Sequence, residues 1–310
     1  MTSSYAFIIP ALNEEANIGR TIESIKGVMG TRNYSIIVCD NGSTDNTPTI
    51  ASNAGARVVV NPDATIAKLR NIGAHLTTQK ILVFIDADVT LDENWHAELS
   101  HSMEKWANKD LIITGSRCRT LGNSSLLDKH WFSLLDNNNS NYINSGHLIV
   151  TRQAFELVGG FDENLKTAED HDFCIRAQTL NIPIVPDRNL KAYHFGYPSR
   201  VLDFIARESW HGKEDVRSFG NFFESKTAVS SIFLIASKLV GILLVVTGIH
   251  VCAGAIILIL SILLTLIILK IKFKNEKIKS LPLTYLFLEM YLLGRALSIF
   301  RSDKRPKARR

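Results

Sequence analysis

The sequence is poor in cysteine and lacks the glycine-rich loops that bind phosphate in the commonest nucleotide-binding folds. Its four cysteines, Cys39, Cys118, Cys174 and Cys252, never form a Cys-x-x-Cys pair. This spacing argues against a zinc or disulfide framework and predicts reduced, mostly buried thiols. Neither G-x-G-x-x-G nor G-x-x-x-x-G-K-[ST] occurs, so a dinucleotide fingerprint and a P-loop are both excluded. Any phosphate group that this chain binds therefore needs another counter-charge.

A second absence is that of charge, because residues 239–269 contain no Asp, Glu, Lys or Arg. A single helix of that length would measure about 46 Å, against about 30 Å for the hydrocarbon core of a bilayer. Two spans joined by a tight turn near residues 248–252 fit this length better, and a buried hairpin in a soluble core is the alternative. We therefore predict a transmembrane helical hairpin over residues 226–272.

Positive charge is concentrated near the C-terminus. Residues 270–310 contain 12 Lys and Arg and three Asp and Glu, a net charge of +9, which leaves −4 for residues 1–269 out of the total of +5. A basic segment beside apolar helices is typical of contact with an anionic cytoplasmic leaflet, so nucleic acid is not needed to explain it. We predict a basic membrane-proximal tail over residues 273–310. Residues 281–300 should form an interfacial or re-entrant helix, with a third span as the alternative.

The N-terminal stretch MTSSYAF has neither a basic n-region nor a long apolar h-region. We therefore expect no signal peptide and a cytoplasmic domain over residues 1–225. Together with the hairpin, this predicts a multi-pass protein of the cytoplasmic (inner) membrane.

The first 115 residues alternate short apolar runs with helical patterns. Predicted strands cover residues 5–9, 35–39, 57–60, 80–85 and 111–114, and predicted helices cover residues 15–28, 45–53, 64–75 and 93–107. Further helices are predicted at 153–158, 169–180 and 199–211, after a polar stretch, DNNNSNYINSG, that suits a surface loop near a site. This order predicts an α/β fold with a mostly parallel sheet flanked by helices, followed by the transmembrane helical hairpin.

Polar residues follow three of the predicted strands. They are Pro10, Asn13 and Glu14 after the first, Asp40 and Asn41 after the second, and Asp86 and Asp88 after the fourth. Each cluster alone could simply cap the next helix. Because ligands of open α/β sheets bind at the carboxyl ends of the strands, we expect the three clusters to converge on one crevice.

The pair Asp86 and Asp88 places two like charges one residue apart at the end of an apolar strand. Such carboxylates repel each other and lose solvation, unless a cation is shared between them. Mg²⁺ and Mn²⁺ prefer carboxylate oxygens and keep coordination positions open for a substrate phosphate. The pair therefore predicts a divalent metal site that bridges to a diphosphate.

Six stretches carry a family resemblance: IIPALNEEANIGRTIESI, VCDNGSTDNT, KLRNIGA, FIDADV, VGGFDENLKTAEDHDFCIRA and AYHFGYPS. In this order they resemble a family 2 glycosyltransferase with the GT-A fold, over residues 5–215. The resemblance implies an inverting, hexosyltransferase-type enzyme whose donor is a nucleotide-diphosphate sugar, with UDP favoured over GDP.

The resemblance also assigns roles to individual residues. By resemblance, the base and ribose pocket is lined by Pro10, Asn13, Glu14 and Asp40. Arg70 would lie near the nucleotide or its phosphates, Asp86 near the ribose and the metal, and Asp88 on the metal itself. His194 matches a late histidine that contacts metal or phosphate in some members, and a surface or core histidine is the alternative.

Asp170 matches the catalytic base of the family. An inverting displacement needs a base for the proton of the acceptor hydroxyl, and the adjacent Glu169 can raise the pKa of its neighbour. Capping of the following helix is the alternative for both residues, and it stays open for Glu169 and Asp172. Glu169 and Arg207 are further candidate donor contacts. Arg207 lies in ARESWHGK, which departs from the Gln-x-x-Arg-Trp motif of polymerising members, so we expect a non-processive enzyme.

Taken with the membrane segments, these residues predict a metal-dependent, inverting glycosyltransferase of cell-envelope polysaccharide synthesis. Its acceptor would be lipid-linked or a growing surface glycan. A polyprenyl-phosphate sugar synthase is the nearest alternative. A membrane scaffold that binds nucleotide sugars without turnover is an alternative of another class.

Overall fold

The computed structural model describes residues 4–105, 110–121, 125–135, 142–274 and 276–300 of the chain. The chain divides into two compact units. The first comprises Met1–Leu121 and Asn139–Gly196, and the second comprises Gly122–Asn138 and Tyr197–Arg310. The domain boundaries expected after residues 225 and 272 stay predictions. Most of the predicted polar loop (136–141) and the end of the basic tail (301–310) lie outside the described residues.

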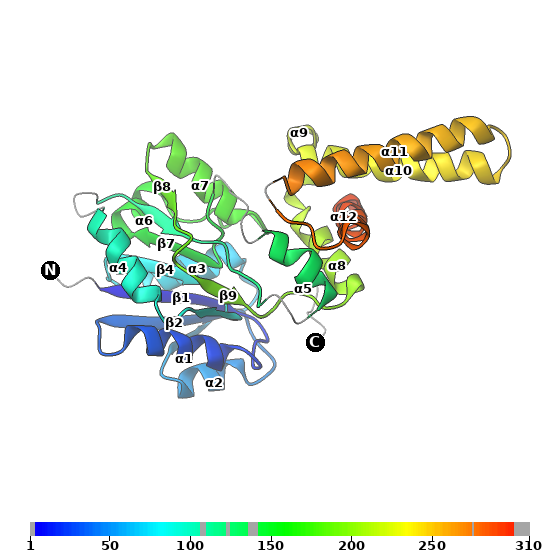
Figure 1. Cartoon of the computed structure of the whole chain (residues 1–310). Helices are drawn as coiled ribbons and strands as arrows, with labels where there is room; N and C mark the ends of the chain where they lie inside the picture. The colour runs from blue at the N-terminus through cyan, green and yellow to red at the C-terminus, as the bar shows by residue number, and fades with distance from the viewer. Residues whose placement is uncertain (1–3, 106–109, 122–124, 136–141, 275, 301–310) are drawn as a thin grey trace. The chain divides into compact units, whose positions relative to one another are not determined.

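The first unit is built on a seven-stranded sheet flanked by helices (Figure 1). Its strands are β1 (Tyr5–Ala11), β2 (Tyr34–Asp40), β3 (Arg57–Val60), β4 (Ile81–Ile85), β6 (Ile113–Gly115), β7 (His147–Thr151) and β8 (Ile184–Pro186). Its helices are α1 (Ile18–Met29), α2 (Thr47–Asn53), α3 (Ile66–His75), α4 (Trp95–Lys105), α6 (Arg152–Val158) and α7 (Glu169–Thr179). A separate small sheet pairs β5 (Val89–Leu91) with β9 (Ala192–His194).

The large sheet has the strand order β3-β2-β1-β4-β7-β6-β8. Strand β1 pairs in parallel with β2 and β4, β2 pairs in parallel with β3, and β6 with β8. Strand β7 runs antiparallel to both of its neighbours, β4 and β6. The predicted fold class, a mostly parallel sheet flanked by helices, is therefore confirmed.

The central strands divide their side chains between two cores. Along β1, Tyr5, Phe7 and Ile9 point into a core shared with α1, α2 and α4. The alternate side chains, Ala6 and Ile8, point into a core shared with α3, α6 and α7. This period of two is that of a strand, and burial on both faces explains the uninterrupted apolar runs in the sequence. Polar side chains are consequently left for the strand ends, where the candidate site lies.

The second unit consists of helices. They are α5 (Leu126–His130), α8 (Val201–His211), α9 (Phe219–Glu224), α10 (Lys226–Val246), α11 (Val251–Lys272) and α12 (Leu281–Ala296), with 3₁₀ turns η1 (Phe132–Leu135), η2 (Glu214–Val216) and η3 (Leu297–Phe300). Within the described ranges, three helical segments are long and apolar enough to cross a membrane. They are 226–246, 251–272 and 281–300, with mean hydropathies of 2.4, 3.0 and 1.3.

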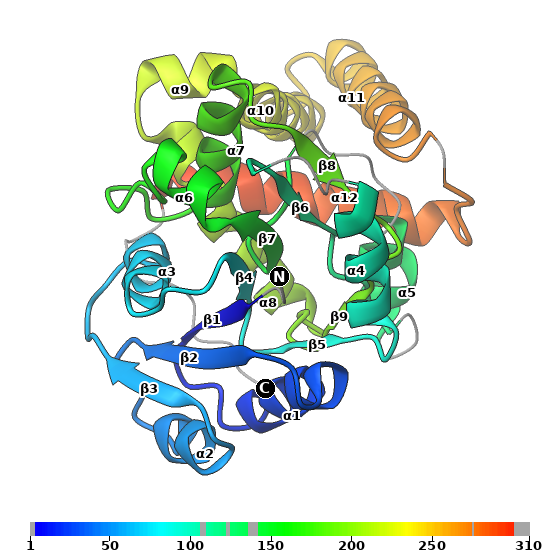
Figure 2. The same ribbon diagram turned by 90° about the vertical axis from the view of Figure 1, so that its left-hand side faces the viewer.

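Helices α10 and α11 form the predicted hairpin, and α12 crosses it steeply. Figure 1 shows α12 end-on while the hairpin runs across the view, and in Figure 2 α12 itself runs across the view. Lys238 of α10 ties the three helices together. Its Nζ lies 2.5 and 2.6 Å from the two carboxylate oxygens of Glu289 on α12, and 3.1 Å from Thr265 Oγ1 on α11. A partly buried ion pair thus joins α12 to the hairpin.

Candidate active site

Three potential metal ligands meet beyond the carboxyl end of β4. Asp86, Asp88 and His194 each offer one ligand atom, and these atoms lie within 4.8 Å of one another. His194 Nε2 is 3.4 Å from Asp88 Oδ1. The side chains of Asp88 and His194 are only 14% and 16% exposed, whereas that of Asp86 is 31% exposed. Two carboxylates and an imidazole therefore converge on one point that solvent can reach.

The backbone around β5 and β9 brings these ligands together. The two aspartates stand on the turn between β4 and β5, where the N–H of Val89 donates to the Asp86 carbonyl over 3.1 Å. The N–H of Phe195 donates to the Asp88 carbonyl over 2.9 Å, and Val89 lies opposite His194 in the β5–β9 pairing. The small sheet thus carries a histidine from late in the sequence to the aspartate pair.

The donor set of this cluster fits a divalent cation. Carboxylate oxygens suit both Mg²⁺ and Mn²⁺, and the imidazole nitrogen is better accepted by Mn²⁺. His194 Nδ1 accepts the N–H of Gly196 over 3.1 Å, so the neutral ring keeps its proton on Nε2. A cation at Nε2 calls for the other tautomer, with the proton on Nδ1.

A buried arginine links this cluster to the start of α7. Arg70 on α3 is 1% exposed. Its Nη2 lies 2.8 Å from Asp86 Oδ1, and its Nη1 lies 2.6 Å from Glu169 Oε1. The rigid guanidinium fork therefore fixes both carboxylates relative to each other. Arg70 and Glu169 bond to each other, Arg70 also bonds to Asp86, and Glu169 also bonds to Ser145. The predicted contacts of Arg70 and Glu169 with the donor stay predictions.

Asp170 lies in the first turn of α7, where it is 7% exposed. Its Oδ2 accepts the N–H of Ser145 over 3.2 Å, and its Oδ1 accepts the N–H of His171 over 2.8 Å. The N-cap residue is Ala168, in a left-handed conformation with φ 61°, so neither Asp170 nor Glu169 occupies the N-cap position. The Asp170 carboxylate still bonds to the first turn through the His171 N–H, and it also bonds to Ser145 outside the helix.

Burial and the adjacent Glu169 carboxylate raise the pKa of Asp170 to about 7. Both effects disfavour the ionised form, and Glu169 is itself held in place by Arg70. A group that titrates near neutral pH is suited to take up a proton in catalysis. Asp172, for which helix capping was left open as an alternative, forms an ion pair with Arg176 one turn later, over 2.7 Å.

The ends of β1 and β2 form a second polar region at the same edge of the sheet. Asp40 is fully buried, and its Oδ2 accepts the N–H groups of Gly42 and Ser43 over 3.0 and 2.8 Å. Asn13, with φ 55°, accepts the N–H of Thr44 on its Oδ1 over 2.8 Å and donates its own N–H to Ser43 Oγ over 2.8 Å. These bonds tie the two loops together.

Two other predicted residues of the nucleotide pocket belong to the same loops. Pro10 is buried within β1, opposite Cys39 of β2. The N–H of Glu14 donates to Thr47 Oγ1 over 2.7 Å, and its carboxylate accepts from Asn17 Nδ2 over 3.1 Å. The roles predicted for Pro10, Asn13, Glu14 and Asp40 in binding a nucleotide stay predictions.

Arg207 lies on α8 in the second unit. Its Nη1 is 2.6 Å from Glu208 Oε1, and its guanidinium lies over the rings of Phe132 and Tyr197, with its Cζ 5.5 and 5.7 Å from their centroids. These contacts belong to the second unit alone, and the predicted contact of Arg207 with the donor stays a prediction.

Two glycines in the site have a steric reason that the sequence analysis did not find. A Cβ at Gly196 would overlap the Asp88 carboxylate, and a Cβ at Gly146 would press on Asp86 Oδ2. The Gly146 carbonyl also accepts the N–H of Asp86 over 3.3 Å. Ser145, next to it, donates its hydroxyl to Glu169 over 3.1 Å. Gly146 and Gly196 lie in the stretches INSG and HFG, and the composition of these stretches does not indicate which side chain packs against each glycine.

A buried histidine supports the same region. Trp95 Nε1 donates to His147 Nε2 over 2.7 Å, and His147 Nδ1 accepts the N–H of Ser116 over 3.3 Å and lies 3.0 Å from Ser116 Oγ. Burial lowers the pKa of His147 to about 4, so this ring stays neutral at physiological pH. His147 follows Gly146 and opens β7, and its bonds fix the strand end beside Asp86.

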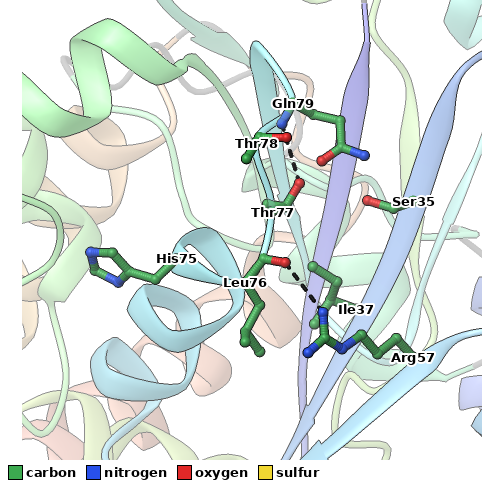
Figure 3. A pocket seen from close by; sticks show the side chains of 8 residues that line it. All are labelled: Ser35, Ile37, Arg57, His75, Leu76, Thr77, Thr78 and Gln79. Carbon is green, nitrogen blue, oxygen red and sulfur yellow. Dashed lines mark hydrogen bonds between the residues drawn. The ribbon is translucent and has the colours of Figure 1, made fainter.

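A hollow of about 470 Å³ lies at the opposite ends of the strands (Figure 3). Ser35 and Arg57, near the starts of β2 and β3, line it together with the turn after α3. The Arg57 guanidinium points to the Leu76 carbonyl, 3.4 Å away. Asp86, Asp88, Asp170 and His194 are not among its lining residues.

Known proteins similar to this chain are glycosyltransferases. Residues 6–153 match the model of a family described as glycosyl transferase family 2. These residues, just under half of the chain, are thus similar to a family 2 glycosyltransferase domain. An uncharacterised glycosyltransferase of Mycobacterium tuberculosis is 33% identical over 110 residues, 36% of this chain and 47% of that protein. Pre-mycofactocin glycosyltransferase of M. tuberculosis is 24% identical over 219 residues, 66% of this chain and 45% of that protein. The chain thus spans about half the length of these curated relatives.

Solved structures share the fold of this chain at low sequence identity. Mannosyltransferase PcManGT from Pyrobaculum calidifontis, in complex with GDP-Man and Mn²⁺, superposes with a TM-score of 0.58 at 14% identity, covering 97% of this chain and 88% of that one. S. aureus TarS in complex with UDP-GlcNAc gives 0.51 at 18% identity, covering 67% and 65%.

Proposed function

We propose that this protein is an inverting, divalent-metal-dependent glycosyltransferase that moves a sugar from a nucleotide-diphosphate donor to a hydroxyl acceptor. The observation that carries the proposal is the Arg70 bridge, because it joins Asp86 of the metal cluster to Glu169, the neighbour of Asp170. Groups suited to hold a diphosphate and a group suited to accept a proton therefore belong to one connected site. The match to family 2 supports the same reaction.

In the proposed reaction, Asp170 takes the proton of an acceptor hydroxyl while the acceptor oxygen attacks the anomeric carbon. A bond forms between these two atoms, and the bond from the anomeric carbon to the diphosphate oxygen breaks. The nucleoside diphosphate leaves with the electron pair, and attack from the opposite face inverts the anomeric configuration. Asp86, Asp88 and His194 would hold the Mg²⁺ or Mn²⁺ that offsets the negative charge of the leaving diphosphate.

For the donor we favour a UDP-sugar over a GDP-sugar, on the family resemblance of the sequence. The fold accepts both nucleotides, since TarS was solved with UDP-GlcNAc and PcManGT with GDP-Man and Mn²⁺. We assign the nucleotide to the loops after β1 and β2, where Asn13 joins the two loops and Asp40 holds the turn that follows it.

The buried base favours a hydroxyl acceptor over a phosphate acceptor. A hydroxyl must lose its proton as it attacks, and a carboxylate with a pKa of about 7 can take it. A phosphate monoester is already ionised near neutral pH and would be repelled by the Glu169–Asp170 pair. We therefore propose a lipid-linked sugar or a growing surface glycan as the acceptor, with polyprenyl phosphate as the alternative.

We further propose that the α10–α11 hairpin spans the cytoplasmic membrane, with the family 2 domain in the cytoplasm. The basic residues between α11 and α12 support this orientation. The steep crossing of α12 supports a helix that lies along the membrane surface, and the Lys238–Glu289 pair lets the two charges offset each other next to the apolar hairpin.

The native cysteines allow a direct test of this topology. Cys252, next to the hairpin turn, is exposed, whereas Cys39, Cys118 and Cys174 are buried. A membrane-impermeant maleimide added to intact cells with a permeable outer envelope should label Cys252, and Cys252→Ser should abolish the signal. In that background, Phe300→Cys, at an exposed position, should be labelled only after the membrane is opened. Labelling of Phe300→Cys from outside would favour a third span.

The function itself is tested with the detergent-purified chain. It is incubated with a panel of UDP- and GDP-sugars and Mn²⁺, Mg²⁺ or EDTA, with and without a membrane-lipid extract as acceptor source. Release of nucleoside diphosphate is measured, and we expect metal-dependent release from one donor. Metal-dependent donor binding without any release would favour the scaffold alternative, and absence of donor binding would refute the proposal.

A further inference from the structure

The peptide between the two aspartates is held by a side chain of α1. Thr21 Oγ1 donates to the Ala87 carbonyl over 2.8 Å, and Ala87 stands between Asp86 and Asp88. Thr21 is 1% exposed and Ala87 is 4% exposed, so water does not compete for this bond. The bond therefore connects the core of the domain directly to the backbone of the metal-binding turn.

A second hydroxyl of the same helix holds the far end of this segment. Ser24 Oγ accepts the N–H of Leu91, the last residue of β5, over 3.2 Å, and donates to the Thr21 carbonyl over 2.8 Å. Because Thr21 and Ser24 are three residues apart on a helix, their side chains lie on one face, one turn from each other. The two hydroxyls thus hold the segment 87–91 at both ends.

Thr21 is an exception on its own helix. The other residues that α1 buries in this domain are apolar: Ile18, Ile22, Ile25, Val28 and Met29. A valine would fill the volume of Thr21 equally well, so the hydroxyl contributes the hydrogen bond to Ala87 rather than packing. Within the described ranges, the neighbouring carbonyls of Asp86 and Asp88 are held by backbone N–H groups, whereas the Ala87 carbonyl is held by this side chain.

We propose that Thr21 and Ser24 form a hydroxyl clamp that positions the metal ligands, so that the cation affinity of the site depends on α1. The orientation of the Ala87 peptide sets the directions in which Asp86 and Asp88 leave the backbone. The position of β5 sets that of His194, because Val89 and His194 are opposite each other in the small sheet. This inference rests on the proposed metal-dependent function.

The test measures Mn²⁺ binding rather than turnover. Mn²⁺ is titrated into the purified full chain with UDP present, and free Mn²⁺ is followed by electron paramagnetic resonance. Thr21→Val should weaken Mn²⁺ binding about tenfold, as expected when a group that orients metal ligands is lost. Thr21→Ser keeps the hydroxyl and should retain most of the affinity.

Thr114→Val is the matched control. Thr114 on β6 is also 1% exposed, and its Oγ1 donates to the Val185 carbonyl over 2.7 Å. The same substitution there removes a partly buried hydrogen bond from a threonine hydroxyl to a backbone carbonyl, away from the proposed metal ligands. Thermal unfolding should show similar losses for Thr114→Val and Thr21→Val, but only Thr21→Val should weaken Mn²⁺ binding.

Equal Mn²⁺ affinity of Thr21→Val and Thr114→Val would overturn the clamp. If Thr21→Val does not fold, Ser24→Ala carries the test. It removes the bonds of Ser24 to the Leu91 N–H and to the Thr21 carbonyl but keeps the Thr21 hydroxyl on Ala87. Unchanged Mn²⁺ affinity in Ser24→Ala would then overturn the proposal. Absence of Mn²⁺ binding by the wild-type chain would refute the metal-dependent function itself, and the clamp with it.

Discussion

Replacing Asp170 by asparagine keeps the shape of the side chain but removes its capacity to take a proton. The pKa of Asp170 is raised to about 7 by burial and by Glu169, and a base acts only in its unprotonated form. The transfer rate of the wild-type protein should therefore fall as the pH drops through about 7. Between about pH 6 and pH 8 the ionised fraction of such a group rises about tenfold, and the rate should rise with it.

The assay is the initial rate of nucleoside-diphosphate release at saturating donor and metal, measured across this pH range. Asp170→Asn should lose a factor of about 10² to 10⁴ in rate and should lose the pH dependence as well. Asp172→Asn is the matched control, because that carboxylate lies on the same helix but pairs with Arg176. A near-normal rate for Asp170→Asn, or a wild-type pH profile in that variant, would refute the role of Asp170 as base.

The same pKa shift has a consequence for stability. Because the pKa of the Asp170 carboxyl is raised from 3.8 to about 7 in the folded protein, the folded state holds the proton more tightly than the unfolded state. The contribution of this carboxyl to the free energy of unfolding is therefore fully present below about pH 3.8 and is lost as the pH rises through about 7. Asp170→Asn should accordingly raise the melting temperature more at about pH 8 than at about pH 5. An equal change at both pH values would contradict the shift.

Four further variants test separate parts of the structure. Asp88→Ala should abolish metal-dependent donor binding, and unchanged affinity with Mn²⁺ in calorimetry would remove it from the ligands. Gly196→Ala places a Cβ against the Asp88 carboxylate, so it should weaken Mn²⁺ about tenfold or more; wild-type affinity would contradict the packing. Arg70→Met leaves two carboxylates unpaired and should destabilise the protein by about 3–5 kcal/mol, which denaturant unfolding would show or refute. Lys238→Met should lower the melting temperature, and adding Glu289→Met should restore most of it; no recovery in the double variant would argue against the pair.

The sheet and its helices could largely be predicted from the sequence, because the central strands are buried on both faces. The apolar run ILVFI was expected at residues 80–85, and β4 covers Ile81–Ile85. The helix expected at 64–75 is α3, Ile66–His75. Strand β7 was missed because it is antiparallel and follows a loosely patterned region, and β5, β8 and β9 have only three residues each. Such short strands carry no period of two that a sequence pattern could show.

Parts of the candidate site could be predicted where neighbouring residues in the sequence indicate a chemical role. They could not be predicted where a side chain bonds to a residue that is distant in the chain. Asp86 and Asp88 stand out as a pair in the sequence, and the structure places His194 beside them. That these three residues bind a metal ion stays a prediction. The partners of Arg70 were not foreseeable, since the bonds to Asp86 and Glu169 cross 16 and 99 residues of sequence. For Asp40, the sequence could not tell a ligand contact from the turn contacts that the structure shows.

The Lys238–Glu289 pair also bears on how this chain is made. The two residues are 51 positions apart, and synthesis at about 5–20 residues per second separates their emergence by about 3–10 s. If the hairpin enters the membrane as proposed, Lys238 arrives before its counter-ion exists. Insertion of the hairpin is then completed only when α12 reaches the bilayer. A chain truncated before Glu289 would carry an uncompensated charge in its hairpin, and such a product is a natural target for quality-control proteolysis.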